Sequence, residues 1–169
     1  ANEHEDVSKA VQTAIIFAAV CGAVMTIVGL IATPSLLRLL KTPEDTILDS
    51  TRYLRIIFMA MIPGMIYNMG SAILRAVGDS KRPLYFLIIC CLLNVVMDIV
   101  AVLVFKLAVE GVAIATSIAQ LISAILVCRS LMRSRDSYRL ELKKLLIEGR
   151  MMSRAIHIGL PAGFQAVLY

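Results

Sequence analysis

The sequence predicts an all-α membrane protein, a polytopic helix bundle, and two observations carry this prediction. Of the 169 residues, 59% are hydrophobic and only 17% are charged, and the mean hydropathy is +0.84. A chain of this composition cannot cover its whole surface with polar groups. The charged residues also fall in blocks, and they leave four long apolar stretches between them.

The four apolar stretches define the predicted membrane helices. They cover about residues 10–33, 54–74, 84–105 and 111–128, and each carries at most one charged residue. Each is at least as long as the roughly 17 residues that a helix needs to cross the hydrocarbon core of a bilayer. Residues 1–128 are therefore predicted to form one domain of four spanning helices.

The first and the last span carry small residues at every fourth position. These residues are Ala10, Ala14, Ala18 and Gly22 in the first span, and Gly111, Ala115, Ala119 and Ser123 in the last. In lipid, helices associate mainly through close van der Waals contact, which small residues allow. We expect both stripes to pack against neighbouring helices.

The second span contains Pro63 and Gly64 near its middle. A proline inside a helix frees a carbonyl group and bends the axis. The bend is either a static kink or a functional element, namely a hinge or an opened turn that lines a cavity. Unwound backbone at membrane depth occurs only where protein or water satisfies its polar groups, which is why an opened turn indicates a cavity. Asn68, in the same span, is a further candidate for a cavity-lining position.

Two segments follow the four spans. Residues 129–154 contain eight Lys and Arg residues and are predicted to be a basic cytoplasmic linker that lies along the lipid headgroups. Residues 155–169 are apolar again, but these 15 residues are too few to span. We expect them to be the truncated start of a further membrane helix.

The basic residues predict an orientation. If the N-terminus is inside, twelve of the seventeen Lys and Arg residues lie on the cytoplasmic side, in the N-terminal segment and in loops 75–83 and 129–154. This is the positive-inside bias of a multi-pass protein of the plasma membrane. It accounts for the net charge of +5, so no nucleic-acid partner is expected.

Enzyme and metal chemistry find little support in the sequence. The four cysteines are not arranged in spaced pairs, and the two histidines stand apart from other ligand types. We find no nucleophile motif, phosphate-binding loop or dinucleotide fingerprint. The sequence predicts no enzyme, no metal centre of the usual kind and no organic cofactor.

Asp98 is the exception in the third span, because a charged residue near the centre of a lone membrane helix costs roughly 2.5 to 3.5 kcal/mol. Asn94 lies one helical turn before it and shares its face. The short connection at 106–110 makes the third and fourth spans antiparallel neighbours. Counting from it at about 1.5 Å per residue, Thr116 differs from Asp98 in depth by only about 3 Å, and Gln120 comes level with Asn94.

Two interpretations of these polar residues remain open. In the first, these side chains hydrogen-bond across helices and fix the helix register, and each hydrogen bond contributes about 0.6 kcal/mol. Alternatively, Asp98, Asn94 and Thr116 bind a proton or a cation such as Na⁺, and Gln120 lines the same cavity. The spans contain no Lys or Arg inside their apolar cores to pair with the acid. Carboxylate, amide and hydroxyl oxygens are also ligands that a hard cation prefers.

Three motifs resemble the multidrug and toxic compound extrusion (MATE) transporters. The first is a loop of the LRGxGDxxxP type, seen here as Leu74, Arg75, Gly78, Asp79 and Pro83. The second is an N-x-x-x-D pair, Asn94 and Asp98, and the third is a GxAxAT segment that consists of Gly111, Ala113, Ala115 and Thr116. Ala76 and Val77 stand where the family often has a glycine. The resemblance extends over nearly the whole chain.

The resemblance implies a partial lobe of a twelve-helix antiporter. The chain would hold the third to sixth helices of the first six-helix lobe, the linker, and the start of the seventh helix. Such a transporter exports organic cations or drugs in exchange for Na⁺ or H⁺, and its partners are the lipid bilayer, these small molecules, and the remainder of its own chain. In one branch of the family, an aspartate of the first helix shares a cation site with the residues that resemble Asn94, Asp98 and Thr116.

Two other functions compete with this one. A lipid-linked oligosaccharide flippase of the same superfamily would have the same fold, but its cavity is typically basic, and the four spans offer no internal Lys or Arg. A small four-helix membrane scaffold, complete in itself, would explain the helix-packing stripes without transport.

Overall fold

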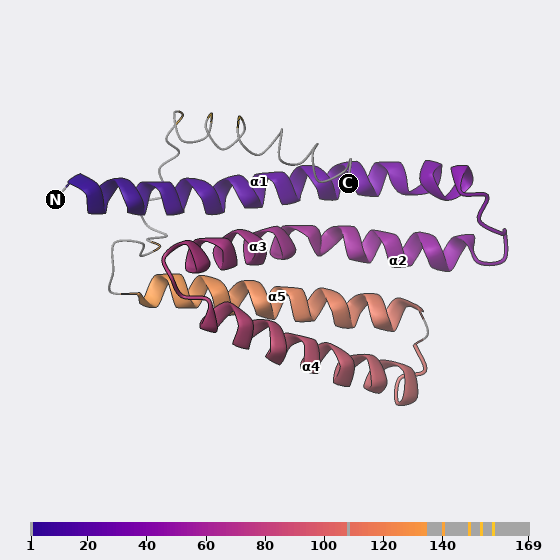
Figure 1. Ribbon diagram of the computed structural model, residues 1–169. Helices are drawn as coiled ribbons and strands as arrows, with labels where there is room; N and C mark the ends of the chain where they lie inside the picture. The colour runs from indigo at the N-terminus through magenta and orange to yellow at the C-terminus, as the bar shows by residue number, and fades with distance from the viewer. Residues whose placement is uncertain are drawn as a thin grey trace.

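The computed structural model describes residues 2–107 and 109–134, together with the single positions 140, 149, 153 and 157. These residues contain five helices and no strand: α1 (Asn2–Leu39), α2 (Ile47–Met59), α3 (Met61–Ala76), α4 (Lys81–Leu103) and α5 (Val109–Arg133) (Figure 1). Four stretches, Val7–Leu39, Ile47–Ala76, Lys81–Leu103 and Val109–Arg133, are long and apolar enough to cross a membrane. The all-α membrane fold is confirmed.

The helices extend beyond the predicted spans at several ends. The first predicted span, 10–33, lies inside a helix that begins at Asn2, and the second begins at Ile47 rather than near residue 54. Polar residues at the end of a span can continue a helix into the headgroup region, which widens the bilayer to about 40–45 Å. α5 likewise includes residues 129–133 of the predicted linker, whereas most of 135–169 lies outside the described residues.

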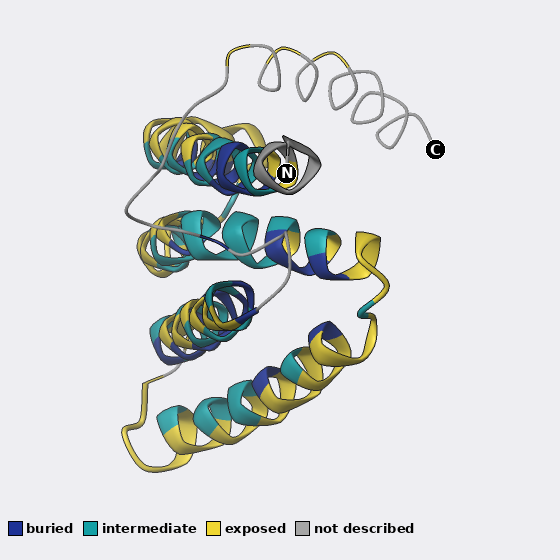
Figure 2. Ribbon diagram, turned by 90° about the vertical axis from the view of Figure 1, so that its left-hand side faces the viewer, coloured by how far each residue is buried: buried dark blue, intermediate teal, exposed yellow. Residues whose placement is uncertain are grey.

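The second span is interrupted at Ala60, between α2 and α3. Pro63 has no N–H to donate to the Met59 carbonyl, so the helical ladder loses a hydrogen bond there. The Ala60 N–H is shared between the carbonyls of Ile56 (3.3 Å) and Ile57 (3.1 Å), and the ladder resumes as the Gly64 N–H donates to Ala60. The two halves overlap in line in the view of Figure 1, but Figure 2 shows that α3 runs across the direction of α2, so the span bends at this break.

The helices lie side by side in a row, in the order α1, α2–α3, α5 and α4 (Figure 1). α1 and α5 each pack against both halves of the broken span, and α4 packs mainly against α5. The apolar core joins α1, α3 and α5 and consists of the residues Val11, Ile15, Leu74, Val127, Leu131 and Leu140. α4 lies at the edge of the row, and most of its surface is exposed (Figure 2).

The small-residue stripe of α5 is buried as expected, from Gly111 through Ala115 and Ala119 to Ser123. The stripe predicted for α1 is only half right, because Ala10 is exposed and Ala14 is half-buried. The buried seam of α1 runs instead through Val11, Ile15, Ala18 and Gly22. A strict four-residue step drifts around a helix of 3.6 residues per turn, whereas alternating steps of four and three stay on one face.

The turn between α3 and α4 explains the LRGxGDxxxP-like motif. Gly78 adopts φ +88°, and the N–H groups of Gly78 and Asp79 bond to the carbonyls of Arg75 (3.0 Å) and Leu74 (2.9 Å). This pairing ends a helix with a residue in the left-handed region, where glycine is favoured. The Asp79 carboxylate then accepts the backbone N–H of Arg82 at 3.2 Å, which satisfies a free donor in the first turn of α4.

Candidate polar site between α4 and α5

The structure brings Asn94 of α4 and Thr116 of α5 together. The Asn94 side-chain amide donates a hydrogen bond to the Thr116 hydroxyl at 3.3 Å, and both residues are half-buried. The antiparallel α4–α5 hairpin produces this contact, because a fixed rise per residue carries both side chains to the same depth. The contact lies within two membrane-length helices.

Asp98 lies one turn after Asn94 on the same helix, and its residue as a whole is half-buried. Its Oδ1 atom, however, is buried and has no hydrogen-bond partner in the part of the chain that the structure describes. An unsatisfied buried oxygen costs about 1–3 kcal/mol, and more when it carries charge. This oxygen is therefore the polar atom of the site that lacks a partner within the described residues.

Gln120 faces a different neighbour. A Cβ atom on Gly64 of α3 would lie 3.0 Å from the Gln120 Oε1 atom, so the amide reaches towards α3. The sequence count placed Gln120 level with Asn94, but depth alone does not determine which neighbour a side chain contacts. Because α5 lies between α3 and α4, the polar residues of α5 are shared between two helix contacts.

The other candidates lie along the broken span. Pro63 is half-buried, and Gly64 provides the space that the end of the Gln120 side chain occupies. Asn68 is exposed and lies one turn after Gly64, on the same side of α3. The structure therefore places Gly64 beside Gln120, at the contact of α3 with α5, whereas Asp98 belongs to α4.

Two hydroxyl groups near the break were not predicted as functional residues. Thr26 of α1 donates to the Phe58 carbonyl at 2.7 Å, and Ser117 of α5 reaches the Ile56 carbonyl at 3.4 Å. Ser117 also bonds within its own helix, to the Ala113 carbonyl at 2.8 Å. Their only sequence signal was a hydroxyl in an apolar span, and such groups often bond within their own helix.

No cluster of three or more His, Cys, Asp or Glu side chains that could hold a metal ion occurs among the described residues. The polar site thus contains one carboxyl group, one amide and one hydroxyl. Carboxylate, amide and hydroxyl oxygens are ligands that hard cations prefer.

Comparison with known proteins gives concordant results. The MatE family model matches residues 1–100. The chain is 32% identical over 177 aligned residues to the "Probable multidrug resistance protein YoeA" of Bacillus subtilis (strain 168), and the match covers 99% of this chain and 38% of that protein. The chain thus spans about two-fifths of that relative's length.

Two solved structures have the same fold. The outward-facing conformation of a multidrug resistance MATE family transporter matches with a TM-score of 0.83 at 23% identity, covering 93% of this chain and 35% of the other. An inward-facing conformation matches with a TM-score of 0.78 at 20% identity, covering 94% of this chain and 42% of the other.

Proposed function

This chain belongs to the MatE family, and from that membership we propose that it forms part of a transporter that exports drugs, coupled to the entry of Na⁺ or H⁺. The curated relative YoeA is named a probable multidrug resistance protein. We propose the same substrate class for this protein, namely small organic, often cationic compounds. The chain supplies four spans, and the rest of the transporter lies in the remainder of the full-length protein.

The observation that carries the coupling proposal is the buried Oδ1 atom of Asp98, which has no partner among the described residues. A carboxylate inside a membrane span must be neutralised, and in this part of the chain no Lys or Arg pairs with it. A mobile cation or proton supplies the missing positive charge. Asn94, one helical turn before Asp98, and Thr116, joined to Asn94 at 3.3 Å, offer two further oxygen atoms.

Cation binding drives transport only through a difference in affinity between two conformations. A shift from 1:99 to 99:1 requires about 5.5 kcal/mol of differential binding. The broken span provides an element that can change shape, because α2 and α3 are joined at Ala60 without a complete helical ladder. We propose that loading of Asp98 biases this element between outward-facing and inward-facing arrangements.

The orientation belongs to the same proposal. The ends of α3 and α5 and the starts of α1 and α4 lie at one end of the row (Figure 1). This end carries Arg75, Lys81 and Arg82, and because the sequence divides its Lys and Arg residues twelve to five in favour of this side, we assign it to the cytoplasmic face of the plasma membrane.

The test uses the full-length protein in liposomes, with a fluorescent cationic dye and an imposed Na⁺ or proton gradient. Asp98→Asn keeps the size of the side chain but removes its charge, and it is expected to abolish gradient-driven dye movement. Thr116→Ala loses one hydrogen bond and is expected to slow transport about fivefold, which corresponds to about 1 kcal/mol. Asp49→Asn is the matched control, because Asp49 is exposed at the start of α2.

Both Asp variants must insert and remain monodisperse before their transport is compared. Wild-type coupled transport by Asp98→Asn would remove Asp98 from the coupling site. It would leave this residue as a helix-packing group and place the coupling acid elsewhere in the transporter.

A further inference from the structure

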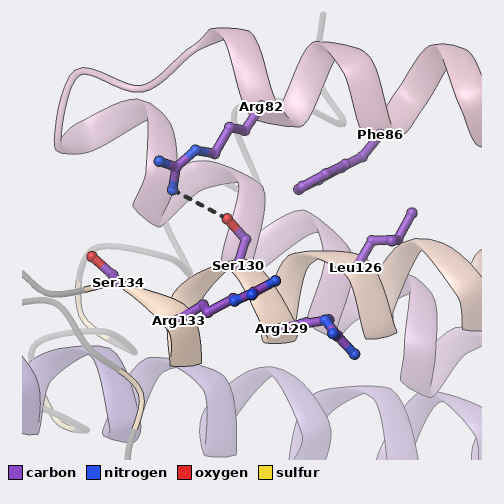
Figure 3. Close-up of a pocket in the computed structure, with 7 residues that line it drawn as sticks. All are labelled: Arg82, Phe86, Leu126, Arg129, Ser130, Arg133 and Ser134. Atoms are coloured by element: carbon purple, nitrogen blue, oxygen red, sulfur yellow. Dashed lines mark hydrogen bonds between the residues drawn. The ribbon is translucent and has the colours of Figure 1, made fainter.

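A basic pocket of about 530 Å³ lies between the start of α4 and the end of α5. Ligand pockets in proteins commonly have volumes of about 300–1,000 Å³. The residues that line it include Arg82 and Phe86 from α4, and Leu126, Arg129, Ser130 and Arg133 from α5 (Figure 3). None of these residues has a part in the Asp98 site.

The pocket carries an excess of positive charge. Arg82 forms an ion pair with Asp79 at 3.0 Å and reaches across to the Ser130 hydroxyl at 3.5 Å (Figure 3). Arg129 and Arg133 are both exposed, and neither has a carboxylate partner among the described residues. The three arginines that line the pocket thus have one carboxylate partner between them among the described residues, which leaves an excess of two positive charges.

The pocket is also divided by polarity along the helix axes. Phe86 lies one turn after Arg82 as α4 enters the membrane, and Leu126 lies three residues before Arg129 as α5 leaves it. At about 1.5 Å per residue, Phe86 is about 6 Å deeper than Arg82, and Leu126 is about 4 Å deeper than Arg129 and about 10 Å deeper than Arg133. Both are half-buried, and both lie on the same side of the pocket in Figure 3.

We propose that this pocket binds the phosphate of an anionic phospholipid, whose acyl chain lies against Phe86 and Leu126. Guanidinium groups bind phosphate oxygens with two parallel hydrogen bonds, and basic pockets between spans at the cytoplasmic side hold anionic lipid headgroups. A soluble phosphate would contact the arginines but would make no use of the apolar wall. A lipid phosphate would also bridge the start of α4 and the end of α5, where the polar contact between Arg82 and Ser130 is long, at 3.5 Å.

The first experiment measures lipid binding by the full-length protein in a neutral detergent. Fluorescent dioleoylphosphatidylglycerol is titrated against dioleoylphosphatidylcholine as the zwitterionic probe. Arg129→Gln combined with Arg133→Gln is expected to weaken phosphatidylglycerol binding by about 25-fold, because each basic group near an anionic headgroup contributes roughly a fivefold factor. Phosphatidylcholine binding is expected to stay unchanged.

The matched control removes two charges from the opposite end of the bundle, with Arg38→Gln and Lys41→Gln. Both positions are exposed, at the end of α1 and just beyond it. This variant is expected to bind phosphatidylglycerol like the wild type. Equal losses in the two double variants would show a general charge effect and would overturn the proposal.

A second experiment uses the unmodified protein and separates a lipid from a soluble anion. Photoreactive phosphatidylglycerol is expected to label the end of α5, and inorganic phosphate at millimolar concentration is expected to leave that labelling intact. Photoreactive phosphatidylcholine is expected to label this segment several-fold less. Loss of labelling to phosphate would identify a soluble-anion site, and equal labelling by both lipids would identify plain lipid contact; either result contradicts the proposal.

Discussion

Replacement of Gly22 by alanine tests how closely α1 rests on the break in the second span. Gly22 is buried against Ile62, two residues beyond Ala60. A Cβ atom at this position would lie 2.7 Å from the Ile62 Cα, whereas ordinary contact begins at 3.4 Å, so the two backbones would have to separate by about 0.7 Å. No side-chain rotation relieves a contact with backbone.

Gly64→Ala is the matched control, because its new methyl group would meet only the end of a flexible side chain. The nearest atom is Gln120 Oε1 at 3.0 Å, and this group can rotate away. Both substitutions gain the same helix propensity, about 1 kcal/mol, so this contribution cancels in the comparison. Overpacking costs about 1–3 kcal/mol, and Gly22→Ala should be less stable than Gly64→Ala by that amount.

The assay is the free energy of unfolding of the full-length protein in mixed micelles, with a denaturing detergent as the titrant. The two variants are compared with each other as well as with the wild type. Equal unfolding free energies for Gly22→Ala and Gly64→Ala would show that α1 and α3 do not approach as closely as the structure indicates. The bracing of the break by α1 would then lose its main support.

Two further predictions concern the topology and the broken span. Ser80 and Thr46 are exposed at opposite ends of the row, so single cysteines at these positions in a cysteine-free full-length parent should react with an impermeant thiol reagent from opposite sides of the membrane. Labelling of both from one side would contradict the four-span arrangement. Pro63→Ala restores an N–H for the Met59 carbonyl and should leave folding nearly intact while it slows dye transport, because the break at Ala60 would then close; transport at the wild-type rate would make the break a static kink.

The sequence predicted best what depends on counting along one hairpin. Asn94 and Thr116 meet because the short connection between α4 and α5 pairs them and because the rise per residue is constant. The number of membrane spans was predicted equally well, because each of the four long apolar stretches has the length that a membrane-crossing helix needs.

The order of helices in the row could not be read from such counts. Gln120 contacts α3 because α5 lies between α3 and α4, and lateral order depends on the shapes of all the packed faces. The helix breaks at Ala60 rather than at Pro63 or Gly64, and the reason is local. Proline removes a bond to the carbonyl four residues earlier, so the disturbance falls in the turn before Pro63.

The arginine pocket shows a second limit of sequence reasoning. Arg82, Arg129 and Arg133 were recognised as part of the cytoplasmic charge bias, which is a property of composition. Their convergence across two helices requires the lateral pairing of α4 with α5, and so does their position above Phe86 and Leu126. Only the structure shows which of the many basic residues share one pocket.

Action of the coupling cation through Asp98 can be tested at equilibrium, without an imposed gradient. The dissociation constant of a fluorescent substrate dye is measured on the purified full-length protein while the Na⁺ concentration or the pH is varied. Linkage requires that a cation bound in exchange for the dye weakens dye binding, by about 5- to 150-fold for typical coupling energies of 1–3 kcal/mol. This shift is expected in the wild type, and a cation-independent dissociation constant is expected in Asp98→Asn. The same shift in Asp98→Asn as in the wild type would contradict this role of Asp98.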